Sequence, residues 1–159
     1  MVSFTVLSLT LLIISHAGGR EDLYAMASCM IILHTASIYA VLVALDPSVR
    51  LRTCRRLRWT RLQFDVLHVV LHLIPFVVVV VAHPPLRVSL AHEIGAVVVV
   101  FTWIAIASWY LPRKSRCTLA GIYVPLYSRN TWSVAEAIGF AAMHLFVLSH
   151  PPDFTWELV

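Results

Sequence analysis

Five long apolar stretches dominate this sequence and restrict what the chain can fold into. They cover residues 2–16, 23–45, 62–82, 90–111 and 132–148. A helix needs about 20 apolar residues to cross the hydrocarbon core of a bilayer, and the first stretch is the one clearly short of that length. An unpaired backbone N–H or C=O group is costly in lipid, so helices are expected rather than open strands. The pattern therefore predicts an all-α transmembrane bundle of about five spans.

The composition also indicates a membrane protein. Of the 159 residues, 60% are hydrophobic and 13% are charged, whereas about 25% are charged in a typical soluble domain. Prolines follow the apolar stretches at positions 47, 84, 112 and 151. A proline ends a helix because it cannot donate to the hydrogen-bond ladder. We therefore expect one integral membrane domain over residues 1–159, with no soluble domain.

The first apolar stretch has two interpretations. Ser15, His16 and Ala17 resemble the small-residue cleavage site of a signal peptide. The stretch lacks the basic region that normally precedes the apolar part of a signal peptide. We therefore favour a retained first span over a removed signal peptide.

The positive charges predict how the spans are oriented. Residues 46–61 and 112–131 lie between spans and hold ten of the twelve Lys and Arg residues. Loops rich in Lys and Arg stay on the cytosolic side of a membrane, or on the matrix side in mitochondria. We expect both loops on that side and the C-terminus on the opposite side. Orientation in the membrane is the simpler explanation of the cations in 46–61. Binding of anionic lipid head groups is the alternative. Nucleic acid is not an expected partner.

Ionisable side chains interrupt the third apolar stretch, in the segment DVLHVVLHLIP. Asp65, His68 and His72 fall on one face of a helix, because successive residues turn by about 100°. Ionisable groups inside a span usually face the bundle interior or a wet cavity. Pro75 cannot donate a backbone hydrogen bond, so a kink is expected just beyond His72. Any chemistry is therefore expected on the inner face of this helix.

Four interpretations of these side chains remain open. The imidazoles can join helices through hydrogen bonds, act as general acids or bases, or relay protons. They can also ligate a metal or a haem, since His34 and His72 both lie near the middle of their spans. The sequence contains no glycine-rich phosphate loop and no GxSxG nucleophile elbow.

Several short motifs resemble the androgen-induced/FAR-17a family of multi-span membrane proteins. They are the histidine stretch that runs into LIPF (His68, His72, Pro75, Phe76), the later helix with Trp103 and Trp109, and YVPLYS at residues 123–128. The chain departs from the family where Val124 separates Tyr123 from Pro125 and in the wider spacing of its two histidines. The resemblance implies hydrolysis of fatty-acid esters of hydroxy fatty acids by an intramembrane Thr and His.

The resemblance and the polar stripe together lead to our first hypothesis, a membrane-embedded lipid-ester hydrolase. Thr5 is the position open to the Thr nucleophile that the resemblance implies. His72 or His68 then serves as general base, and Asp65 orients the imidazole. Such an enzyme needs no cofactor, and membrane lipids are its expected partners.

Two further hypotheses do not involve catalysis. The chain is small and lacks soluble domains, which is typical of a subunit or anchor of a larger membrane complex with protein partners. Such an anchor holds haem b if His34 and His72 are its axial ligands. The last hypothesis is a proton or ion transporter, whose relay runs through Asp65, His68, Glu136 and His144.

Overall fold

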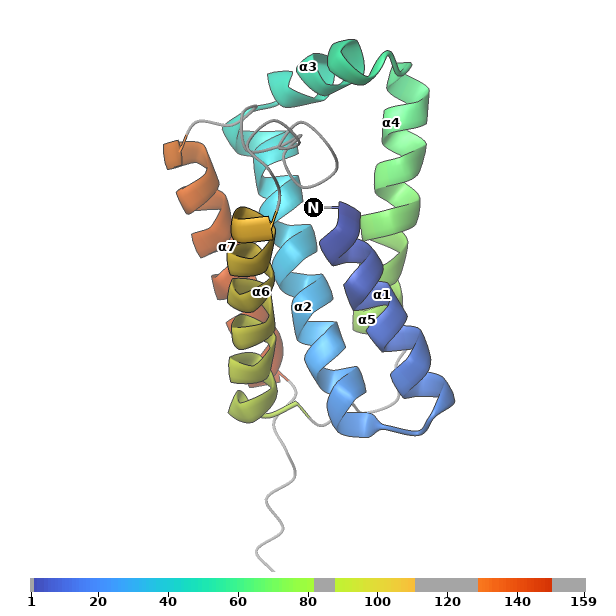
Figure 1. Ribbon diagram of the computed structural model, residues 1–159, viewed down its shortest axis with the longest axis vertical. Helices are drawn as coiled ribbons and strands as arrows, with labels where there is room; N and C mark the ends of the chain where they lie inside the picture. The colour runs from blue at the N-terminus through green and yellow to red at the C-terminus, as the bar shows by residue number, and fades with distance from the viewer. Residues whose placement is uncertain (1, 82–87, 111–128, 150–159) are drawn as a thin grey trace, which may run out of the picture.

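The described part of the chain is built from helices alone. Figure 1 shows the computed structural model, which describes residues 2–81, 88–110 and 129–149, with side chains described for 5–81, 88–102 and 134–149. No strand occurs in those residues, so the all-α prediction is confirmed for them. The elements, in chain order, are α1 (Val2–Ala17), α2 (Glu21–Tyr39), the π-helical segment η1 (Ala40–Leu45), α3 (Ser48–Leu57), α4 (Arg61–His68), the π-helical segment η2 (Val69–Leu73), α5 (Ile74–Val81), α6 (Leu90–Tyr110) and α7 (Arg129–Ser149).

Two of the helices are long and apolar enough to cross a membrane. They are the continuous helices Glu21–Leu45 and Arg61–Val81, with 25 and 21 residues. Helices of this size measure about 32–38 Å, against a hydrocarbon thickness of about 30 Å. The apolar segments described in the other helices are shorter, namely Thr5–Ala17, Leu90–Thr102 and Val134–Ser149. Length and composition therefore support two membrane spans, and the predicted five-span bundle goes beyond this finding.

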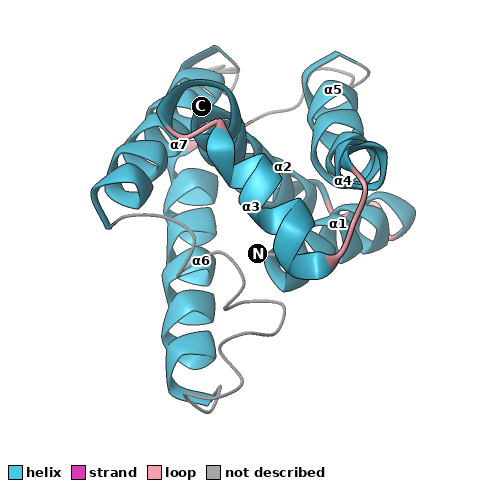
Figure 2. Ribbon diagram, turned by 90° about the horizontal axis from the view of Figure 1, so that it is seen from above, coloured by secondary structure: helices cyan, strands magenta, loops and turns pink. Residues whose placement is uncertain are grey.

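The helices run in alternating directions around α2. In Figure 1, α1 descends, α2 returns, the α4–α5 helix descends, α6 returns and α7 descends. Seen from above in Figure 2, α2 lies between α1, α5, α6 and α7, and it packs against all four. Every side chain from Tyr24 to Ile38 is buried except those of Met26 and Ala36. The centre of the bundle is therefore α2.

A tight turn joins α1 to α2. The N–H of Arg20 donates to the carbonyl of Ser15 at 2.8 Å, and the N–H of Gly19 donates to the carbonyl of His16 at 3.3 Å. Gly19 has a φ of 62°, a left-handed conformation that glycine adopts without a Cβ clash. Because this closure satisfies carbonyls at the end of α1, the chain can reverse at once and pack α2 against α1.

A helix occupies much of the Arg-rich segment 46–61, which the sequence predicts as a loop. Val49, Thr53 and Cys54 form one face of α3 and are buried. The amphipathic pattern stabilises a helix here even though the segment is polar overall. The other predicted loop, 112–131, lies outside the described residues as far as residue 128.

Polar contacts fix the start of α3 and the start of the following helix, α4. Before it, Arg52 and Ser48 donate to the carboxylate of Asp46, and these bonds lower the pKa of Asp46. Their stabilisation is complete above the unfolded aspartate pKa of about 3.9 and is lost as the pH falls through the lowered folded value. After α3, Thr60 and Gln63 form a capping box with N–H···O distances of 3.1 and 2.9 Å.

Each of the two helices Glu21–Leu45 and Arg61–Val81 contains a π-helical segment. In η2, the N–H of Ile74 donates to the carbonyl of Val69, five residues earlier. In η1, the N–H of Asp46 donates to the carbonyl of Val41 at 2.8 Å. The sequence predicts a disturbance of the helix at Pro75, and the structure has a wider turn directly before this proline.

The backbone of α7 approaches α2 closely at Gly139. A Cβ added there lies 2.6 Å from the carbonyl oxygen of Leu33 and overlaps the side chain of Ser37. Gly95 on α6 differs, because its added Cβ meets the flexible side chain of Met26, with the sulfur at 3.1 Å. Gly139 is therefore the position where a missing side chain decides how near two helices can come.

We expect Gly139→Ala to lower the thermal unfolding midpoint of the purified protein, because overpacking against α2 costs roughly 1–3 kcal/mol. Gly95→Ala is the matched control. The thioether of Met26 can move aside, and alanine in a helix is better than glycine by about 0.5–1 kcal/mol. Circular dichroism in detergent micelles should show a level or raised midpoint for the control. Equal losses in both variants would contradict the close approach of α2 and α7.

Candidate functional site

Four polar side chains meet inside the apolar bundle. Thr5 belongs to α1, His34 to α2, His68 to the end of α4 and His72 to η2. Their exposed fractions are 3%, 7%, 5% and 5%. We name these four residues the Thr–His cluster. Buried polar groups are costly unless they find partners, so the contacts of the cluster define what it can do.

A short hydrogen bond joins α1 to α2 within the cluster. Thr5 Oγ1 lies 2.8 Å from His34 Nε2. Thr5 lies on the buried face of α1 together with Ser8, Leu12 and Ser15, mostly small side chains that let α1 approach α2. The sequence predicts His72 or His68 as the partner of Thr5, whereas the structure gives it His34. A hydroxyl and an imidazole at this distance are the arrangement of a nucleophile and its base.

The three imidazoles form a continuous row from α2 to α4. The ring centroids of His34 and His72 are 5.1 Å apart, and those of His72 and His68 are 5.3 Å apart. Phe64 stacks on His68 at 3.9 Å and closes the row. The hydroxyl of Thr35 donates to the backbone carbonyl of His72 at 3.4 Å, which ties η2 to α2. The row therefore links α2 to the continuous helix Arg61–Val81 through rings in contact.

Two ring nitrogens of this row have no hydrogen-bond partner in the described part of the chain. Nδ1 of His68 lies 2.9 Å from the carbonyl of Phe64 and must donate to it. The Nε2 of His68 is then the acceptor in the neutral ring. This Nε2 and the Nδ1 of His72 are buried and have no hydrogen-bond partner among the described residues. Such atoms are the ones that a buried water or a substrate group can satisfy.

Asp65 does not orient an imidazole as predicted. Its carboxylate is bonded to Arg50 of α3, and its side chain is 43% exposed. Asp65, His68 and His72 therefore do not all face the interior of the bundle, although the sequence predicts that they do. The two histidines face the interior, whereas Asp65 fastens α4 to α3.

The arrangement of His34 and His72 does not fit a haem. Axial imidazoles bind the iron from opposite faces of the porphyrin, but here the two rings are in contact and Nε2 of His34 is bonded to Thr5. Within the described ranges, no group of three or more His, Cys, Asp or Glu residues is placed to hold a metal ion.

The residues of the predicted proton relay are not brought together as a chain. Asp65 is bonded to Arg50 near α3. His144 lies on α7, and its Nδ1 is 3.0 Å from Glu93 at the start of α6, near the opposite end of the bundle. Glu136, the fourth residue of the relay, is partly buried on α7. The histidine at the centre of the relay, His68, contacts Phe64 and His72 instead.

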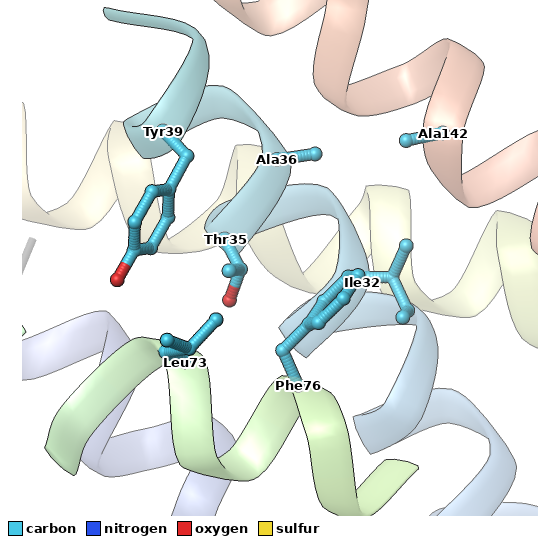
Figure 3. Close-up of a pocket in the computed structure, with 7 residues that line it drawn as sticks. All are labelled: Ile32, Thr35, Ala36, Tyr39, Leu73, Phe76 and Ala142. Carbon is cyan, nitrogen blue, oxygen red and sulfur yellow. The ribbon is translucent and has the colours of Figure 1, made fainter. Parts of the chain in front are cut away.

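A cavity of about 230 Å³ lies between α2 and the helix that contains η2. Figure 3 shows the side chains that line it, which come from α2, η2, α5 and α7: Ile32, Thr35, Ala36, Tyr39, Leu73, Phe76 and Ala142. The lining is almost wholly apolar, and the hydroxyl of Thr35 is turned towards the carbonyl of His72. The cavity suits a hydrocarbon group and adds no titratable side chain to the Thr–His cluster.

Comparison with protein-family models, with curated proteins and with solved structures finds no match to this chain. The motif YVPLYS lies outside the described residues, as do the side chains of Trp103 and Trp109. The interpretation of the site therefore rests on the geometry of the Thr–His cluster.

We expect Thr5→Val to lower the unfolding midpoint measurably, because it leaves Nε2 of His34 buried without the hydroxyl. Loss of one partner of a buried hydrogen bond costs about 1–3 kcal/mol. Thr5→Ser keeps the hydroxyl and should recover most of the loss. Thermal unfolding in micelles measures the difference, and similar midpoints for the two variants would argue against the Thr5–His34 bond.

Proposed function

We propose that this chain is a multi-span membrane hydrolase that cleaves a lipid ester with Thr5 as nucleophile and His34 as general base. The observation that carries the proposal is the buried Thr5–His34 contact of 2.8 Å. A threonine hydroxyl is a weak nucleophile until a neighbouring base accepts its proton. In a water-poor site this transfer needs a base already in position, as His34 is.

The reaction proceeds in two steps. Nε2 of His34 takes the proton of Thr5 as Oγ1 attacks the ester carbonyl, and it returns the proton to the alcohol when the C–O bond breaks. Water then attacks the acyl group on Thr5, which releases a fatty acid and restores the hydroxyl. Nε2 of His68 and Nδ1 of His72, which the described residues leave without a partner, are suited to hold this water because they lie in the same ring row as His34.

The substrate class comes from the resemblance to the androgen-induced/FAR-17a family, which suggests fatty-acid esters of hydroxy fatty acids. Two features of the chain support a lipid substrate. The Thr–His cluster is surrounded by apolar helices, and the cavity beside η2 has space for part of a hydrocarbon chain.

We further propose that the chain crosses the membrane five times, with α3 on the cytosolic or matrix side. The alternating directions of α1, α2, α4–α5, α6 and α7 support this topology. So does the charge distribution: the arginines of 50–61 lie at one end of the bundle, and Glu21, Asp22 and Glu93 lie at the other.

Labelling with a fluorophosphonate probe tests the hydrolase. We expect the purified protein to be labelled, Thr5→Ala to abolish labelling, and His34→Ala to reduce its rate by about 10²–10⁴-fold, the usual contribution of a general base. Thr35→Ala is the matched control, because Thr35 is a buried threonine next to His34 that contacts a backbone carbonyl and not an imidazole nitrogen.

The outcomes separate catalysis from structure. Labelling lost in Thr5→Ala and kept in Thr35→Ala supports the proposed nucleophile. Absence of labelling in the wild-type protein, or labelling that persists in Thr5→Ala, contradicts it. A lower unfolding midpoint without any labelling would assign Thr5 and His34 to helix association alone, as in a non-catalytic subunit.

Cysteine accessibility tests the topology. In a chain whose native cysteines are replaced, single cysteines are placed at Ser48, Glu21 and Ser149 and treated with a membrane-impermeant maleimide in sealed vesicles. We expect Glu21→Cys and Ser149→Cys to react from one side and Ser48→Cys from the other. Reaction of Ser48→Cys and Glu21→Cys from the same side would contradict a membrane-crossing α2.

A further inference from the structure

The helix α3 lies across one end of the bundle, as Figures 1 and 2 show. It connects Glu21–Leu45 to Arg61–Val81, the two helices whose length and composition allow them to cross a membrane. A short connection between two spans, here one that contains the ten-residue helix α3, lies at the level of the lipid head groups. The position of α3 therefore follows from the proposed topology and does not depend on any hydrolysis.

Two arginines of α3 are already paired inside the protein. Arg50 is bonded to Asp65 on α4, and Arg52 is bonded to Asp46 in the connection before α3. These pairs hold α3 against its neighbours. Val49 and Cys54 are buried side chains of α3 itself. The opposite face of this helix is therefore turned away from the bundle.

Three other arginines are exposed and lack a carboxylate partner among the described residues. Arg55, Arg58 and Arg61 are spaced three residues apart, from the last turn of α3 to the start of α4. The turn between them is fixed, because the N–H of Trp59 donates to the carbonyl of Cys54 at 2.9 Å and the capping box follows at Thr60. The three guanidinium groups are thus presented from a defined backbone.

Arg58 occupies a backbone position that normally favours glycine. Its φ is 55° and its ψ is 35°, a left-handed conformation that disfavours residues with a Cβ. Trp59, beside it, is 37% exposed, and indole rings are enriched at the head-group level of membranes. Arg58 and Trp59 thus place a cation and an indole at the same turn, and both side chains suit an anionic membrane surface.

We propose that Arg55, Arg58 and Arg61, with Trp59 between them, bind the phosphate groups of anionic phospholipids in the leaflet where α3 lies. Guanidinium groups match phosphate oxygens in bidentate hydrogen bonds. Clusters of Arg beside a span gain affinity from the negative surface potential of such a leaflet. The occupant is a lipid and not a soluble polyanion, because α3 is held between two apolar spans.

Lipid titration of the full chain in maltoside micelles tests the proposal. The ligands are dioctanoyl phosphatidylglycerol and dioctanoyl phosphatidylcholine, and the readout is the fluorescence change that Trp59→Phe removes. We expect tighter binding of phosphatidylglycerol, weakened by added salt. Replacing Arg55, Arg58 and Arg61 with Gln should reduce its affinity roughly fivefold for each arginine and roughly 100-fold in total.

Three controls separate head-group binding from other effects. Arg20→Gln removes an exposed arginine at the opposite end of the bundle and should leave the lipid preference intact. Arg58→Gly removes the charge while relieving the backbone, so it should bind phosphatidylglycerol about fivefold more weakly at an unchanged or raised unfolding midpoint. Soluble glycerophosphoglycerol at the same concentration should not compete.

The proposal is overturned if the triple Gln variant keeps the wild-type preference for phosphatidylglycerol. Equal losses in Arg20→Gln and Arg58→Gln would also overturn it, since net charge alone would then explain binding. Competition by glycerophosphoglycerol at equal concentration would assign the arginines to a soluble phosphate. The labelling and topology experiments report separately on hydrolysis and on membrane crossing.

Discussion

The burial of α2 is the constraint on which the rest of the structure depends. A helix that other helices cover on most sides cannot turn its polar side chains to solvent, so each must find a partner inside the bundle. Ser28 and Ser37 do so locally, by donating to the carbonyls of Tyr24 and Leu33 at 2.9 and 2.8 Å. His34 and Thr35 are instead bonded to other helices. The Thr–His cluster is thus the consequence of placing an imidazole on the most buried helix.

This dependence makes structure and chemistry hard to separate at Thr5 and His34. The contact that places the proposed nucleophile beside its proposed base also fastens α1 to α2. In lipid, hydrogen bonds between helices contribute only about 0.6 kcal/mol on average. Packing between α2 and its neighbours must therefore supply most of the association, and the close approach at Gly139 is one place where it does.

The sequence predicts the helices well because their determinants are local. Apolar length and proline stops locate α2 and the α4–α5 helix within a few residues, and the rule that buried ionisable groups face inward holds for His68 and His72. The pairing of Thr5 with His34 is not local, since it depends on which helices become neighbours. The partner of Asp65 is not local either. Its carboxylate is bonded to Arg50 of α3 and not to an imidazole. The π segments have no distinct pattern in the sequence apart from Pro75.

The π segment η2 lies between the imidazoles of His68 and His72 and affects how they line up along their helix. Buried positions on this helix recur every four residues, at Phe64, His68 and His72. In a regular α-helix each such step drifts by about 40° around the axis, so a ladder of side chains would wind away from its neighbour. A turn that takes more residues cancels part of that drift. The wider turn reduces the accumulated rotation about the helix axis, so that His72 stays close to His68 and faces α2.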